Sequence, residues 1–292
     1  KFVGGPGASG LLVAHRSMFR IVRPSSPGGG TVRFVTPETH AYLDDMQARE
    51  EAGTPSIIGD IRAGLVLQLK ADIGMAAIDA AETAAVEHTL AFFADHPALK
   101  LLGSHEADRL AIFSFNIEAD GKMLHHGLVV AMLNDLFGIQ ARGGCSCAGP
   151  YGHDLLGIDS AVSGRYRDLV DNGLEVMKPG WVRVGFPPVM SLADIDYVLD
   201  ALAFLAERGR DLMRLYRADP ATGHWTLASA TTLDALCLWR EHAPVATPAK
   251  TLPGAAEIFS RAHALANAAQ EGDPAGCCAL PDQAHALRWF HL

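Results

Sequence analysis

The 292-residue sequence has no apolar run of 18 or more residues and no cluster of lysines and arginines. The first absence predicts no membrane-spanning helix. With 24 basic and 33 acidic residues the net charge is −9, so a nucleic-acid partner is not expected. Only five cysteines occur, at uneven spacing. They do not form the disulfide framework of a small secreted domain, and a reducing compartment, the cytoplasm, is expected.

Apolar residues, by contrast, are plentiful. The chain is 49% hydrophobic and 20% charged, which predicts a folded protein with a substantial core. Its length suits one large domain or two of medium size. No signal peptide is visible at its start. The sequence opens at Lys1, inside a predicted strand and without a methionine, so we expect a fragment of a longer protein.

The apolar pattern predicts alternating strands and helices between about residues 97 and 216, which indicates an α/β sandwich. Strands are predicted at 99–102, 110–117 and 181–185, the second of them buried on both faces. Helices are predicted from Asp60, then at 75–93, 126–137 and 192–216. Two short strands around a glycine turn are predicted in residues 1–16. Beyond residue 217 prolines interrupt the pattern, and short helices are predicted at 232–241 and 254–270.

The stretch RGGCSCAGPYGH contains two cysteines one residue apart. A zinc site needs four ligands, and Cys145 and Cys147 with a nearby histidine and the distant pair 277–278 give no recognised spacing. A disulfide between Cys145 and Cys147 would close a strained ring. A reactive thiol needs an electropositive, partly exposed loop, which Arg142 and the amides freed by two glycines could supply. A glycine-rich loop with structural cysteines is the alternative.

Three other stretches carry residues suited to chemistry. In WVRVG, Arg183 alternates with apolar residues, and it is either an edge-strand arginine in solvent or a guanidinium fork for a carboxylate. In EAGTP, Gly53 and Pro55 suit a turn before a helix. The Thr54 hydroxyl and nearby amides could instead bind an anion such as phosphate. Lys1, taken alone, has no assignable role.

Taken in chain order, these stretches form a set. They read Lys-x-x-Gly-Gly-Pro-Gly, Gly-Gly-Gly, Glu-x-Gly-Thr-Pro, Arg-x-Gly-x-x-Cys-Ala and Arg-x-Gly-Phe. This order resembles the C-terminal half of a class V pyridoxal-phosphate enzyme, with the cysteine desulfurases and their relatives, including molybdenum-cofactor sulfurases, as the closest match. The resemblance covers about residues 1–205. It implies an α/β fold: the C-terminal part of a fold-type I transferase, with the N-terminal half absent.

The resemblance implies a role for each matching residue. Lys1 matches the lysine that bonds covalently to pyridoxal 5'-phosphate, an electron sink. Thr54 matches a threonine that reaches the cofactor phosphate of the partner subunit. Arg183 matches the arginine that holds the α-carboxylate of an amino acid substrate. Arg142 lies at a family position near the active site, and we expect it to contribute to substrate binding.

The reaction implied by the resemblance is removal of sulfur from L-cysteine through a persulfide on the enzyme. Cys147 matches the nucleophile, which would attack as a thiolate. Cys145 departs from the common desulfurase pattern and resembles the C-x-C of molybdenum-cofactor sulfurases, which leaves open which thiol reacts. The alternatives are a class V aminotransferase or lyase with structural cysteines, and a truncated, non-catalytic chain. No metal site is expected.

The resemblance also implies a domain organisation. Residues 1–60 would be the end of the large cofactor domain, 61–95 connecting helices, 96–216 the small α/β domain, and 217–292 an appended region without an assigned role. A homodimer and a sulfur-acceptor protein are implied as partners. In the family, the groups that pair with the pyridine nitrogen and stack on its ring lie upstream of the lysine. This stretch alone is therefore not expected to hold the cofactor well.

Overall fold

The structure, a computed structural model, describes residues 4–145, 148–228, 253–271 and 280–292. The chain divides into two compact units, Lys1–Ile78 and Asp79–Leu292. Within the described residues, no helix is both long and apolar enough to cross a membrane.

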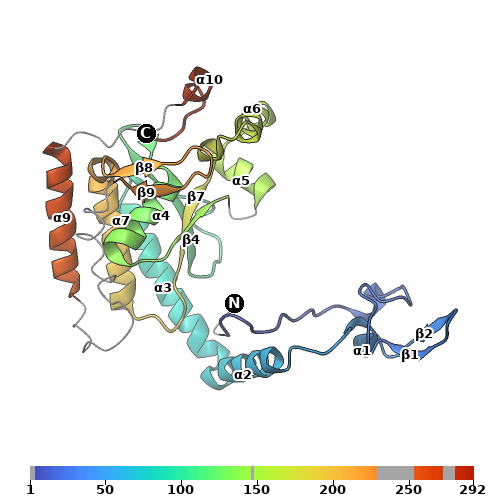
Figure 1. Cartoon of the computed structure of the whole chain (residues 1–292). Helices are drawn as coiled ribbons and strands as arrows, with labels where there is room; N and C mark the ends of the chain where they lie inside the picture. The colour runs from blue at the N-terminus through green and yellow to red at the C-terminus, as the bar shows by residue number, and fades with distance from the viewer. Residues whose placement is uncertain (1–3, 146–147, 229–252, 272–279) are drawn as a thin grey trace, which may run out of the picture. The chain divides into compact units, whose positions relative to one another are not determined.

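The first unit is rich in loops. Its elements are η1 (Arg16–Met18), β1 (Val32–Val35), β2 (His40–Tyr42), α1 (Met46–Glu50), α2 (Ile57–Ile73) and the start of α3 (Met75–Asp95). β1 and β2 form an antiparallel hairpin (Figure 1). Residues 4–15 contain no strand, so the strands predicted in residues 1–16 are not found in the described part. Gly5 and Gly7 take positive φ there and turn the backbone away from an extended path.

The helix predicted from Asp60 is α2, and it begins three residues earlier, at Ile57. Ser56 occupies the N-cap position but makes no side-chain capping bond. Asp60 instead lies in the first turn, where a carboxylate favours the positive end of the helix dipole. The predicted boundary was therefore wrong, although the helix itself is confirmed.

The second unit is built on an antiparallel sheet of order β3-β4-β7-β6. The strands are β3 (Leu99–Leu101), β4 (Ile112–Ala119), β7 (Trp181–Gly185) and β6 (Arg142–Gly144), with β5 (Lys122–Met123) paired to β4 (Figure 1). Phe113, Phe115 and Ile117 are fully buried on one face. Ile112 is 48% exposed, so the prediction that this strand is buried on both faces fails at its first residue.

Helices α4 (His126–Phe137) and α7 (Leu192–Met213) contribute much of the core. The helix predicted at 126–137 is α4; one face of it is buried, and Gly138 caps it in the left-handed conformation. A capping box between Ser191 and Asp194 fixes the start of α7. The apolar residues Ile195, Val198, Leu199, Leu202 and Leu205 of α7 are all buried. Shorter elements complete this part: α5 (Gly149–Leu156), α6 (Ser160–Asp171) and η2 (Glu175–Met177).

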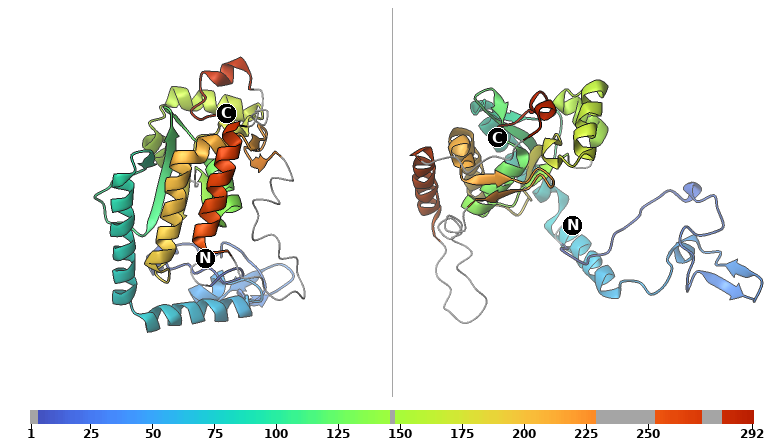
Figure 2. Two further views of the ribbon diagram at one scale, coloured as in Figure 1. Left: turned by 90° about the vertical axis from the view of Figure 1, so that its left-hand side faces the viewer. Right: turned by 45° about the horizontal axis from the view of Figure 1, so that its top comes forward.

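The described residues that follow α7 belong to the same unit. They form β8 (Tyr216–Ala218), β9 (Trp225–Leu227), α9 (Ala255–Glu271) and α10 (Asp282–His285). The helix predicted at 254–270 is α9, and α7 lies between it and β4 (Figure 2). Tyr216, Trp225 and Phe290 are buried in the common core. The helix predicted at 232–241 lies outside the described residues.

The side chain of His125 joins three separate segments. Its Nδ1 accepts the backbone N–H of Gly127, 3.0 Å away, which caps α4, and the indole N–H of Trp225, 2.9 Å away. Nδ1 must therefore be unprotonated, and Nε2 donates to the carbonyl of Val176 at 3.1 Å. The neutral imidazole thus links α4, β9 and η2, and the link needs this single tautomer.

Burial lowers the pKa of His125 well below its ordinary value, and burial lowers the pKa of His126 to about 4. Both imidazoles are neutral in the folded protein but titrate near pH 6.5 when the chain unfolds. Their contribution to stability is thus complete above about pH 6.5 and is lost as the pH falls toward 4. We expect the free energy of unfolding, measured by urea denaturation, to decrease steadily across that window.

His125→Asn separates this effect from general acid sensitivity. Asn can still accept at the Nδ1 position but does not titrate, so the variant should be less stable at pH 7 and should lose less stability between pH 7 and 5. His263→Asn, which changes an exposed histidine of α9, should follow the original chain. If the free energy of unfolding depends on pH equally in all three proteins, the prediction is contradicted.

Candidate active site

Two predicted site residues, Arg142 and Arg183, lie directly opposite each other on adjacent strands. The register of β6 and β7 pairs Arg142 with Arg183 and Gly143 with Val182. Directly opposite residues of an antiparallel pair project to the same face, with Cβ atoms about 5 Å apart. The two guanidinium groups therefore share one face of the sheet.

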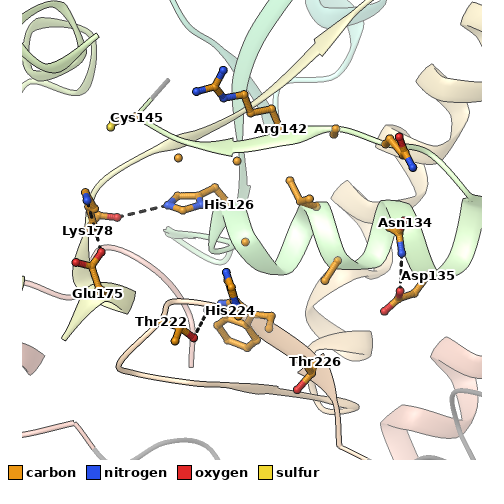
Figure 3. A pocket seen from close by; sticks show the side chains of 18 of the residues that line it. His126, Asn134, Asp135, Arg142, Cys145, Glu175, Lys178, Thr222, His224 and Thr226 are labelled. Carbon is orange, nitrogen blue, oxygen red and sulfur yellow. Dashed lines mark hydrogen bonds and ion pairs between the residues drawn. The ribbon is translucent and has the colours of Figure 1, made fainter. Parts of the chain in front are cut away.

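Strand alternation identifies that face. Val182 is buried in the core, and a Cβ on Gly143 would lie 3.2 Å from Val130 of α4, so this pair faces the helices. Arg142 and Arg183, one residue along, face the other way. Figure 3 shows the Arg142 side chain leaving its strand on the side away from α4. Ser114 of β4 pairs with Arg183 and extends the polar row.

Like charges directly opposite each other destabilise a sheet unless an anion compensates them. Arg183 is only partly buried, and its guanidinium makes no hydrogen bond or ion pair with the described residues. Its planar guanidinium is suited to bind a carboxylate through two parallel hydrogen bonds. This geometry allows Arg183 to bind a carboxylate, and that role stays a prediction.

Cys145 follows β6 directly and is a free, partly buried thiol. Gly144 before it has φ of 110°, a conformation that glycine adopts most easily. The N–H of Ala148 donates to the carbonyl of Cys145 at 3.1 Å, and α5 begins at Gly149. The predicted nucleophile Cys147 lies outside the described residues, as does Lys1.

Thr54 belongs to the first unit, where it is exposed just before α2. Two predicted stretches meet beside it: the N–H of Gly53 donates to the carbonyl of Gly29 at 2.8 Å, and Gly53 has a positive φ of 80°. The Gly-Gly-Gly and Gly-Thr-Pro stretches therefore lie together and leave the Thr54 hydroxyl accessible. This arrangement suits an anion such as a phosphate.

An open cleft of about 1110 Å³ adjoins the same strand on its helix side. Its walls come from α4, β6 and the β8–β9 hairpin, and Cys145, Lys178 and His224 are among its lining residues (Figure 3). His126, at the start of α4, lies between the strand and the hairpin. Its Nε2 is 3.4 Å from the carbonyl of Lys178, and its buried Nδ1 has no hydrogen-bond partner among the described residues.

Sequence reasoning did not identify His126 or the hairpin. The only local signal was a pair of adjacent histidines at the start of a predicted helix. Polar residues are common at helix starts, so this pair did not indicate a site. The role of the hairpin depends on contacts between residues about 100 positions apart, such as that of Trp225 with His125.

The family description "Aminotransferase class-V" matches residues 1–198. The chain belongs to the class V aminotransferase family. It is 32% identical over 146 residues to a cysteine desulfurase of Dickeya dadantii, covering 50% of this chain and 34% of the relative. It is 31% identical over 172 residues to a probable cysteine desulfurase of Halobacterium salinarum, covering 57% of this chain and 40% of the relative.

A solved structure agrees with this placement. The apo cysteine desulfurase of Thermococcus onnurineus NA1 aligns with a TM-score of 0.51 and 26% identity, over 63% of this chain and 39% of that protein. The predicted mixed α/β fold class is confirmed, as part of a fold-type I domain. This class V chain spans less than half the length of these relatives.

The contacts of His126 make Gly180 a sensitive position. A Cβ there would lie 2.7 Å from two atoms of the His126 ring and 2.8 Å from the backbone of Gly144. We expect Gly180→Ala to lower the free energy of unfolding by about 1–3 kcal/mol, because β6, β7 or the imidazole must move. Gly149→Ala is the control, since open space surrounds that position. Equal stability of the two variants by urea denaturation would contradict this prediction.

Proposed function

We propose that the complete protein is a pyridoxal-phosphate-dependent enzyme that removes sulfur from L-cysteine. The observation that carries the proposal is the direct pairing of Arg142 with Arg183 on one sheet face, with Arg142 three residues before Cys145. The proposed carboxylate site thus lies on the strand that leads to the cysteines. Membership of the class V family and the likeness to cysteine desulfurases support the same conclusion.

The residues in this chain fit the cofactor where they are described. The exposed Thr54 hydroxyl, beside a glycine-rich loop, can donate a hydrogen bond to a phosphate oxygen. Lys1, which lies outside the described residues, is proposed as the covalent attachment point. When bound, pyridoxal phosphate supplies an electron sink for the amino acid substrate.

In this proposal each protein group has one task. Arg183 holds the substrate α-carboxylate and fixes the orientation of the bonds around Cα, a positioning effect. Arg142, opposite it, adds positive charge on the same face. Cys147 attacks the substrate sulfur as a thiolate: the S–S bond of a persulfide forms on Cys147, the substrate Cβ–S bond breaks with its electron pair left on the carbon fragment, and proton uptake by that fragment gives alanine. A homodimer, a separate sulfur acceptor and a cytoplasmic location are parts of the same proposal.

Arg183→Ala should weaken use of L-cysteine. Loss of a charge-assisted, two-point contact of about 2 kcal/mol lowers kcat/KM about 30-fold. Arg183→Lys should recover only part of this, because lysine keeps the charge but not the planar fork. Sulfide release by the complete protein measures both variants. Arg217→Ala, at an exposed position of β8, is the control, and a loss no larger than in this control would overturn the assignment.

Cys147→Ala should lower sulfide release by about 10²-fold or more, since the nucleophile is gone. Cys145→Ala should change it less than about threefold on the same basis. The reverse order would assign the reaction to Cys145. Retained turnover in both variants, together with amino-group transfer to a keto acid, would favour the class V aminotransferase or lyase instead. If the complete protein shows no cofactor absorbance, both enzyme hypotheses fail.

A further inference from the structure

The part of the chain beyond the family match contributes to the surroundings of the candidate site. The match ends at residue 198, in the middle of α7. Trp225, of the β8–β9 hairpin, nevertheless lines the cleft that Cys145 also lines. Residues 280–292, here called the C-terminal segment, contain the buried side chains of Leu280, Ala284 and Phe290.

The C-terminal segment is held in one register. The N–H of Met123 donates to the carbonyl of Trp289 at 3.3 Å, and the N–H of His291 donates to the carbonyl of Met123 at 3.0 Å. The hydroxyl of Tyr166 donates to the carbonyl of Leu287 at 2.9 Å. Phe290, between the anchored residues, is fully buried. These bonds fix the position of the Trp289 ring.

The Trp289 ring stacks on both histidines at the start of α4. Its centroid is 5.6 Å from that of His125 and 5.9 Å from that of His126, with interplanar angles of 26° and 25°. The first contact supports the imidazole that already joins three segments. The second contact has no such explanation, because among the described residues the His126 ring makes only one hydrogen bond, which is long.

The His126 ring also packs closely against two backbone stretches. A Cβ on Gly143 would lie 3.2 Å from its Nδ1, and a Cβ on Gly180 would lie 2.7 Å from its Nε2. Gly143 is two residues before Cys145, and Gly180 is three residues before Arg183. A Cβ at Gly180 would force the ring or the backbone to shift, and a Cβ at Gly143 would make a tight contact with the ring. The imidazole therefore fills the space under the ends of both strands that carry the candidate site.

We propose that His126 is a positioning residue, through which Trp289 of the C-terminal segment fixes the backbone that carries Cys145. The inference rests on the proposed function in one respect only: that function gives this backbone a catalytic role, because the proposed nucleophile Cys147 follows Cys145 by two residues. The support is one of packing: the His126 ring stacks on Trp289 and lies close to Gly143 of β6 and to Gly180, the residue before β7. β7 is held by both β4 and β6, whereas β6 is the last strand of the sheet, so Cys145 should respond more strongly than Arg183.

The test compares His126→Gln, His126→Phe and Trp289→Leu in the complete protein. We expect His126→Gln and Trp289→Leu to raise amide hydrogen exchange in residues 142–145, and the rate of Cys145 alkylation by iodoacetamide, about tenfold, with exchange in β4 unchanged. The kcat for sulfide release should fall about tenfold. Binding of L-alanine, which has the carboxylate but no sulfur, should stay within about twofold when followed by cofactor absorbance. His126→Phe keeps an aromatic ring and should restore most of the loss.

His96→Gln is the matched control, because His96 also stacks on an aromatic ring, Phe92 at 4.0 Å, and binds a carbonyl, at 2.7 Å. It should leave all readouts unchanged. Unchanged exchange and alkylation in the test variants would overturn the inference, as would an equal rise in β4. If His126→Phe is as inactive as His126→Gln, the inference is overturned and proton transfer by His126 is favoured instead. If the original protein releases no sulfide, the proposed function fails, and the exchange and alkylation results still decide this inference.

Discussion

The packing of the second unit depends on one buried imidazole that must remain neutral. His125 accepts two N–H groups at Nδ1 and donates one at Nε2, so protonation of Nδ1 would break two bonds at once. Those bonds start α4, hold the hairpin through Trp225, and fix the carbonyl of Val176. Three segments far apart in the sequence meet at one side chain. The position of α4, on which β6 packs, follows from this junction.

The placement of the arginine pair then follows from strand alternation and from glycine. A Cβ on Gly143 would lie 3.2 Å from His126 and from Val130, closer than most Cβ contacts. The helix side of β6 therefore favours a residue without Cβ, and strand alternation turns Arg142 to the other face. The register with β7 puts Arg183 opposite it. The positive face of the sheet is thus a consequence of how closely α4 approaches the strand.

Elements governed by local patterns could be predicted from the sequence. Apolar spacing identified α4 and α7, and Gly138 marked the end of α4, because these signals lie within one turn of helix. Of the strands expected in residues 1–16, none lies in the described residues 4–15, since a strand also needs a partner, which no local pattern reveals. In the site, motif order identified Arg142 and Arg183 separately. Their direct pairing, and the role of His126, arise from contacts between distant segments.

In the proposed chemistry, the carboxylate is bound from β7, which is paired on both sides, and the thiol comes from the segment that follows the edge strand β6. A carboxylate must stay fixed while bonds at Cα change, and Arg183 lies on a strand hydrogen-bonded on both sides. A thiol that takes up sulfur must also present it to an acceptor, and the proposed nucleophile, Cys147, comes two residues after Cys145, which itself follows the last strand of the sheet, outside any helix or strand. Such a position needs support from outside the sheet, because only one neighbouring strand constrains it. The stacked rings of Trp289 and His126 lie where that support would have to come from.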